Sequence, residues 1–192
     1  ISGYLRKECF LDALCYFEEM KMAGVSPNEV TFSCMLKACS NIEDIGKGVE
    51  IHAEVCRKGL LRTNCYLGNG LIEMYAKTGN LTKAQEVFDE LLVRNVVTWT
   101  VLIGAYAMND HEEEAINCFE EMKIKGFAPN PITFSCVLKA CGIVGAIDKC
   151  DEIYAEICRK GLLENDLFLT SALVDLYAKW GFLNKAREIF DL

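Results

Sequence analysis

The side chains that could carry covalent or metal chemistry include eleven cysteines and two histidines. So many cysteines raise two alternatives, a disulfide framework and a metal site. Cys34 and Cys39 are five residues apart, as are Cys136 and Cys141, no Cys-x-x-Cys pair occurs, and the histidines are isolated in the sequence. Several cysteines also recur on apolar faces. We therefore expect free thiols that pack as small hydrophobic side chains, with no metal and no other cofactor.

The carboxylates do not form a catalytic pattern. They are plentiful, but runs such as Glu112–Glu114 and Glu120–Glu121 fall on the polar faces of expected helices. The sequence contains no nucleophile elbow, no phosphate-binding glycine loop and no set of zinc ligands. We therefore predict that this chain is not an enzyme.

The elements that position these side chains come from an internal repeat with a spacing of 102 residues. Phe17–Lys21 recurs as Phe119–Lys123, and Cys56–Leu61 recurs as Cys158–Leu163. Self-similarity at a fixed period is typical of a solenoid, in which each unit packs mainly on its neighbours. The period divides into units of 35, 36 and 31 residues. The chain is then one array of six units, of which the first and the last are partial: 1–28, 29–64, 65–95, 96–130, 131–166 and 167–192.

Each unit is predicted to form two helices. In the unit 96–130, the Thr98 hydroxyl is expected to cap a helix that ends near Met108, Asn109–Asp110 breaks the chain, and Gly126 stops the second helix. The same pattern predicts first helices at 31–40, 67–77, 98–108, 133–142 and 169–179. It predicts second helices at 10–22, 44–58, 81–91, 112–124, 146–160 and 183–191. The expected fold class is all-α, a right-handed α-solenoid of stacked antiparallel helix pairs with the first helices on its concave side.

The composition excludes a membrane-spanning protein and weighs against a nucleic-acid-binding protein. The sequence has no run of about 18 uncharged apolar residues, so we expect no membrane span. The formal net charge of −8 disfavours a nucleic-acid partner, because phosphate contacts need lysine and arginine. The acidic residues, however, cluster on the second helices. A solenoid that is basic inside and acidic outside could still bind a polyanion.

Three unit types carry a resemblance to a known family. They contain Val97–Ile103 with Phe119–Met122, Leu36–Cys39 with Ile51–Ala53, and Gly68–Lys77 with Val87–Asp89. Together these motifs resemble the P, L and S repeats of the pentatricopeptide repeat (PPR) proteins of the plant-type PLS subfamily, and the resemblance covers the whole chain. A tetratricopeptide array would instead show a uniform period of 34 residues.

The resemblance implies recognition of single-stranded RNA at about one base per repeat. In the family, the fifth and the last residue of a repeat select the base. Those positions here are Ser33, Asn64, Asn69, Asn95, Thr100, Asn130, Ser135, Asp166 and Ser171. Short side chains of this kind carry donors, acceptors or both, and they can meet a base edge. Each alone is equally suited to capping a helix, and only their recurrence favours recognition.

The family also assigns stacking and backbone roles. The second residue of each unit would lie between neighbouring bases, although packing between helices is the alternative. These residues are Val30, Tyr66, Val97, Ile132 and Phe168. The thirteenth residue would lie near the RNA backbone, although a solvated cation is the alternative. These residues are Arg6, Lys77 and Lys179, and Lys37 and Lys139 share the ninth position.

The family's pairing preferences predict a base for each complete unit. The expected preferences are C over U for Asn69 with Asn95, A for Thr100 with Asn130, weakly A for Ser33 with Asn64, and weakly G for Ser135 with Asp166.

The expected function of this chain is selective RNA binding in a mitochondrion or chloroplast, for editing, processing or stabilisation of transcripts. The alternative is a helical-repeat scaffold, or a subunit of a large assembly, whose acidic convex face binds proteins. The chain begins and ends inside repeats, so we expect a fragment of a longer protein. A zinc deaminase of the kind that some family members carry could then lie outside it.

Overall fold

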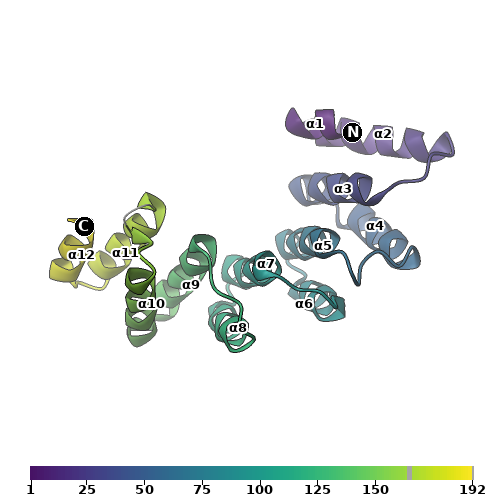
Figure 1. Cartoon of the computed structure of the whole chain (residues 1–192). Helices are drawn as coiled ribbons and strands as arrows, with labels where there is room; N and C mark the ends of the chain where they lie inside the picture. Colours follow the sequence, from purple (N-terminus) through teal and green to yellow (C-terminus); the bar gives the residue numbers. More distant parts are fainter. Residues whose placement is uncertain (164–165, 192) are drawn as a thin grey trace. The chain divides into compact units, whose positions relative to one another are not determined.

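A computed structural model describes residues 1–163 and 166–191 (Figure 1). Within these ranges every regular element longer than a single turn is an α-helix, and no strand is present. The helices are α1 (Ser2–Arg6), α2 (Phe10–Met22), α3 (Glu29–Ile42), α4 (Ile45–Arg57), α5 (Cys65–Lys77), α6 (Leu81–Glu90), α7 (Val96–Met108), α8 (Glu112–Ile124), α9 (Pro131–Val144), α10 (Ile147–Arg159), α11 (Leu167–Lys179) and α12 (Leu183–Phe190). The chain divides into two compact units, Ile1–Ala105 and Tyr106–Leu192, and the division falls inside α7.

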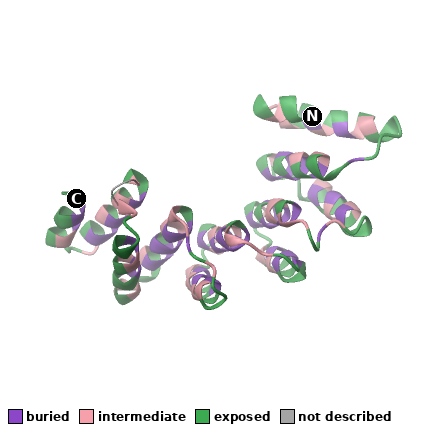
Figure 2. Ribbon diagram, viewed as in Figure 1, coloured by how far each residue is buried: buried purple, intermediate pink, exposed green. Residues whose placement is uncertain are grey.

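In the first unit, the first helices α3 and α5 each pack on the second helices before and after them. α3 contacts α2 and α4, and it also lies beside the next first helix, α5, which in turn packs on α6 (Figure 1). The buried residues lie on the sides of these helices that face one another (Figure 2). Trp99 of α7 is 1% exposed and meets the Phe88 ring edge-on, with 4.7 Å between the ring centroids.

The second unit repeats this packing. α9 contacts α8, α10 and α11, and α11 packs on α12. The Phe119 and Phe134 rings, which are both fully buried, join α8 to α9 in an edge-to-face contact. The Tyr177 hydroxyl donates a hydrogen bond to Asp151 Oδ1 at 2.6 Å, which joins α11 to α10. The all-α fold of stacked helix pairs, as predicted, is therefore present in both units.

The second helices agree with the sequence prediction to within a residue or so, but every first helix begins two residues earlier than predicted. The prediction that Thr98 caps α7 is wrong. Asn95 Oδ1 instead accepts a hydrogen bond from the Thr98 backbone N–H at 3.0 Å. The cap is thus the last residue of the preceding repeat. The exposed apolar residue at the second position of the repeat therefore belongs to the first turn of the helix.

The predicted helix ends are confirmed in the unit 96–130, whereas α3 and α9 end two residues later than predicted, at Ile42 and Val144. α7 ends at Met108, and Asp110 adopts a left-handed conformation with φ of 58°. Gly126, just after α8, has φ of 82°, which a glycine adopts without a steric penalty. These breaks keep the connections short, so consecutive helices fold back on one another.

The cysteines are all free, but the prediction that they pack in the core holds only for some. Cys39, Cys118, Cys141 and Cys150 are buried. The remainder are half-buried or exposed, and the exposed thiols are Cys15, Cys56 and Cys158. None of the described helices combines the length and the apolar character that crossing a membrane requires.

Candidate nucleic-acid interface

A row of exposed apolar side chains marks the start of the first helices. Each is the second residue of its repeat and the second residue of its helix, and each is between 52% and 78% exposed. The residues are Val30, Tyr66, Val97, Ile132 and Phe168. The next position along each helix is buried or half-buried. The exposure of the row is therefore a property of this helix face, and these side chains do not pack between helices.

The last residue of each repeat caps the following first helix through its side-chain oxygen. Asn64 Oδ1 accepts from the Tyr66 and Leu67 backbone N–H groups at 3.1 and 3.2 Å. Asn130 Oδ1 accepts from the Thr133 N–H at 2.9 Å, and Asp166 Oδ1 accepts from the Leu169 N–H at 3.0 Å. These bonds fix which end of each amide is oxygen.

Capping leaves the other polar atom of the side chain available. For Asn64 and Asn130, Nδ2 has no protein acceptor within the described ranges. Asn95 differs, because its Nδ2 donates to Cys65 Sγ at 3.3 Å. Asn64 and Asn130 thus present a donor, whereas the capping Asp166 has a second carboxylate oxygen that can only accept when ionised.

The fifth residues lie three positions after the exposed apolar row, hence on the same helix face. Ser33 and Ser171 are exposed, and Ser135 is half-buried. Asn69 is half-buried, and its Oδ1 has no hydrogen-bond partner in the described part of the chain. Thr100 is only 8% exposed, and its hydroxyl donates to the Val96 carbonyl oxygen at 2.8 Å.

A pocket between α3 and α5 brings these positions together. Its volume is about 300 Å³, and it is lined by Val30, Ser33, Asn64 and Tyr66, with Cys34 beside them. The fifth and last residues of one repeat thus lie in a single pocket between the second residues of that repeat and the next. Burial raises the pKa of the Cys34 thiol, so this neighbour is uncharged at neutral pH. The arrangement can hold a flat ring between two apolar side chains and offer polar atoms to its edge.

A second pocket of about 520 Å³ lies between α9 and α11. Ser135 and Phe168 line it, together with Lys139 and Lys179. The sequence prediction did not include Asp175, which also lines this pocket. Asp175 occupies the ninth position of its repeat, as Lys139 does, and this shared register is the signal that could have found it.

Basic side chains differ between the two sets of helices. The lysines of the second helices form ion pairs with carboxylates: Lys21, Lys47, Lys83, Lys123, Lys149 and Lys185. On the first helices, Lys77 lies 3.4 Å from Glu73, but Arg6, Lys37, Lys139 and Lys179 form no ion pair within the described residues. Lys37, Lys139 and Lys179 thus lie without ion pairs on helices that carry the exposed apolar row, whereas on the second helices the lysines are paired and Arg57 and Arg159 are not, within the described residues.

The helix pairs and the recurring site define an α-helical repeat protein. Two family models match: the PPR repeat family at residues 1–41 and 94–143, and the PPR repeat at 30–60, 69–96, 132–162 and 169–192. The chain belongs to the PPR repeat family.

Similar proteins agree with this assignment. A pentatricopeptide repeat-containing protein of Arabidopsis thaliana is 38% identical over 94% of this chain and 26% of its own length. Another from the same plant, described as mitochondrial, is 36% identical over 98% of this chain and 21% of its own length. A third, described as chloroplastic, is 33% identical over 99% of this chain and 21% of its own length. The chain thus spans about a quarter of the length of these relatives.

Solved structures show the same fold. The crystal structure of the maize pentatricopeptide repeat protein PPR10 has a TM-score of 0.68 at 26% identity, over 92% of this chain and 25% of that one. PPR10 in complex with an 18-nt psaJ RNA element has a TM-score of 0.73 at 22% identity, over 90% and 26%.

Proposed function

We propose that this chain binds single-stranded RNA selectively, at about one base per repeat, within a PLS-type array. The α3–α5 pocket carries the proposal, because one space holds two apolar side chains suited to stacking and two polar side chains suited to a base edge. The proposed repeats are 1–28, 29–64, 65–95, 96–130, 131–166 and 167–192. The RNA complex of PPR10 supports an RNA partner for a chain of this family.

The free atom of the capping residue gives a physical basis for base choice. A capping asparagine presents Nδ2–H, which suits the ring-nitrogen acceptor on the Watson–Crick edge of A or C. A capping aspartate presents an acceptor, which suits the ring N–H of G or U. This agrees with the expected preferences for A at Ser33 with Asn64 and for G at Ser135 with Asp166.

Organelle RNA metabolism is the proposed setting. Relatives described as mitochondrial and chloroplastic support this location, and editing, processing or stabilisation of transcripts are the proposed processes. The chain supplies binding and not catalysis in this proposal. Any catalytic step, including deamination, would come from another domain or protein.

The sharpest test is the substitution Asn64→Asp in the full-length protein, followed by selection of bound RNAs. Aspartate keeps the acceptor that caps α5, so the fold is preserved while the free atom changes from donor to acceptor. The preference at that base should move from A towards G, because a mismatched edge leaves a polar group unpaired at a cost of about 1–3 kcal/mol.

Asn80→Asp is the matched control. Asn80 caps the second helix α6 in the same way, accepting from the Lys83 N–H at 3.1 Å, but it does not line the α3–α5 pocket. This variant adds the same charge and should leave base preference unchanged. If neither variant shifts the selected RNA, base selection by Asn64 is wrong. The protein-binding scaffold, which the acidic second helices favour, then becomes the better explanation.

A further inference from the structure

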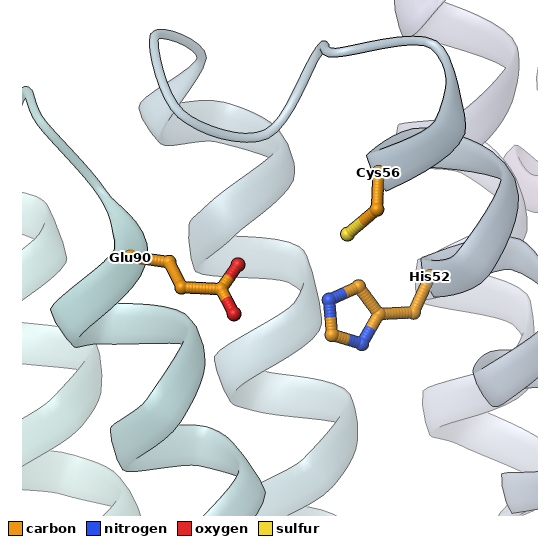
Figure 3. A group of neighbouring side chains, drawn as sticks. All are labelled: His52, Cys56 and Glu90. Carbon is orange, nitrogen blue, oxygen red and sulfur yellow. The ribbon is translucent and has the colours of Figure 1, made fainter.

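A separate cluster of polar side chains lies on two second helices of the unit Ile1–Ala105. His52 and Cys56 are one helical turn apart on α4, and Glu90 is the last residue of α6. One ligand atom from each of these three side chains lies within 4.8 Å of the other two. Figure 3 shows the three side chains directed toward one another across the space between the helices. The cluster does not overlap the lining of the α3–α5 pocket.

His52 is held in an orientation that leaves one ring nitrogen facing this space. Its Nδ1 lies 2.8 Å from the Tyr75 hydroxyl oxygen. Its Nε2 is buried and has no hydrogen-bond partner among residues 1–163 and 166–191. Buried polar atoms in folded proteins nearly always have a partner, so this nitrogen needs an explanation. In Figure 3 it is the ring nitrogen on the side of the Cys56 sulfur and the Glu90 carboxylate.

We propose that His52 Nε2, Cys56 Sγ and the Glu90 carboxylate bind a zinc ion. Imidazole, thiolate and carboxylate are the three side-chain ligands that proteins use for zinc, at about 2.0–2.3 Å from the ion. A set that mixes nitrogen, sulfur and oxygen does not suit magnesium or calcium, which prefer oxygen alone. On binding, the Cys56 thiol loses its proton to solvent and the sulfur coordinates as thiolate.

The surface position of two ligands allows the site to close around the ion. Cys56 and Glu90 are exposed, so their side chains can rotate to shorten the remaining distances. Solvent can then supply a fourth ligand and complete a tetrahedron. Tyr75 acts as a positioning residue: when His52 Nδ1–H donates to the Tyr75 oxygen, the lone pair lies on Nε2.

The internal repeat provides a natural comparison. At a spacing of 102 residues, Tyr154 stands where His52 does, and Cys158 stands where Cys56 does. Cys158 is likewise exposed on its helix, but it has no imidazole one turn before it. Zinc would therefore connect α4 of one repeat to α6 of the next, and Tyr154 deprives the equivalent place 102 residues later of its imidazole ligand. It would stabilise the folded form by mass action.

Titration of the metal-free chain with Zn²⁺, and with Co²⁺ as a spectroscopic probe, tests the proposal. One equivalent should bind, cobalt should give a thiolate-to-metal charge-transfer band, and zinc should raise the thermal midpoint. Cys56→Ser should abolish the band, and Glu90→Gln should weaken binding. Cys158→Ser should change neither. Tyr75→Phe should lower zinc affinity about 10–100-fold, as expected when a ligand loses its orienting partner.

The opposite results would overturn the site. These are a wild-type chain that binds no zinc, a cobalt complex without the thiolate band, binding that survives Cys56→Ser, or equal loss in Cys158→Ser. Since Cys56, Glu90 and Cys158 are all exposed, their variants should fold, and circular dichroism of each verifies this. RNA binding enters none of these measurements.

Discussion

At the scale of single residues, the last residue of a repeat has two polar side-chain atoms, and one of them caps the following helix. Asn130 Oδ1 accepts from the backbone at the start of α9, and its Nδ2 remains available. The sequence presented helix capping and base selection as alternatives, because either role suits a short polar side chain. The geometry makes the two roles compatible, and this could not be predicted without knowing which atom the helix uses.

Replacement of Asn130 separates a capping effect from a charge effect. Asn130→Ala should lower the free energy of unfolding by about 1 kcal/mol, because the Thr133 N–H loses its acceptor. Asn130→Asp should be nearly neutral, since it keeps the acceptor and places negative charge at a helix N-terminus. Denaturant unfolding of both variants gives the comparison. Equal destabilisation by alanine and aspartate would contradict the capping role.

The exposed apolar row leads to a second expectation at this scale. Tyr66 is 78% exposed, so Tyr66→Ala should change stability by less than about 0.5 kcal/mol. RNA affinity should nevertheless fall by about 1–3 kcal/mol, the usual loss when a stacked base loses its aromatic partner. Ile124→Ala on α8, at an equally exposed apolar position, serves as the control and should leave RNA affinity unchanged. A similar loss in both variants would argue against stacking on Tyr66.

At the scale of helices, sequence periodicity predicted which segments are helical but misplaced the start of each first helix. Four second helices, α4, α6, α10 and α12, carry a well-separated apolar face, and their bounds follow from it. The first helices begin with an exposed apolar residue such as Val30 or Phe168, which interrupts the amphipathic pattern. Periodicity alone therefore placed the start after this residue. Recognition of Asn28 or Asp166 as the cap would have placed it correctly.

Neighbouring second helices are joined by ion pairs that recur with the repeat. Lys47 Nζ lies 2.6 Å from Glu18 Oε1, and 102 residues later Lys149 Nζ lies 2.9 Å from Glu120 Oε1. Each lysine also pairs with a carboxylate three residues further along its own helix. Such partly exposed pairs stabilise only modestly. They fix the register of one helix against the next.

The Lys47–Glu18 pair predicts an acid-dependent loss of stability. The hydrogen bond from Lys47 lowers the pKa of Glu18 from its usual value of 4.5. A lowered folded pKa means that the stabilisation is present above the unfolded pKa and is lost as pH falls through the folded pKa. Lys47→Met should therefore destabilise the chain at neutral pH, and this difference should shrink below about pH 4.5. Unfolding measured across this range tests it.

The control for this prediction is Lys83→Met. It removes the Lys83–Glu86 pair, which lies on the exposed face of α6 and does not join two helices. The variant should show little loss of stability at any pH, as expected for an exposed pair three residues apart. If the loss of stability depends on pH in the same way in both variants, the Lys47–Glu18 pair between helices stabilises the chain no more than an exposed pair within one helix.

At the scale of the whole molecule, the net charge of −8 does not describe the charges near the candidate interface. The lysines of the second helices are neutralised by neighbouring carboxylates, whereas Lys139 and Lys179 of the first helices line a pocket without ion pairs in the described structure. Composition predicted a poor polyanion binder because it sums charges that are separated in space. Which charges form ion pairs depends on contacts between helices, and only the pairs within one helix can be read from the sequence.

The salt dependence of RNA binding tests this separation. In the full-length protein, Lys139→Gln and Lys179→Gln should each reduce the slope of log affinity against log salt by about 0.7, the value for one contact to a single-strand phosphate. Lys125→Gln, an exposed position just after α8, should leave the slope unchanged. If all three variants keep the slope of the wild-type protein, the RNA backbone does not contact these first helices.

Side chains brought together by different repeats were the least predictable from sequence. His52 and Cys56 share a helix and their spacing is visible, but Glu90 comes from the next repeat and joins them only after folding. The same holds for the pocket in which Val30 meets Tyr66. Spacing along the sequence predicts which residues are neighbours on one helix. To predict neighbours on different helices, one must also know how those helices pack.

The capping role of the last residue also bears on how such an array evolves. Only a few residues cap a helix well, among them asparagine, aspartate, serine and threonine. Under the proposed RNA binding, mutations among them at Asn64 or Asn130 would exchange the atom offered to a base while the helix keeps its cap. An RNA-binding array built this way can drift to a new target one substitution at a time through ancestors that all fold. Selection for stability would remove most other changes at these positions before their effect on binding mattered.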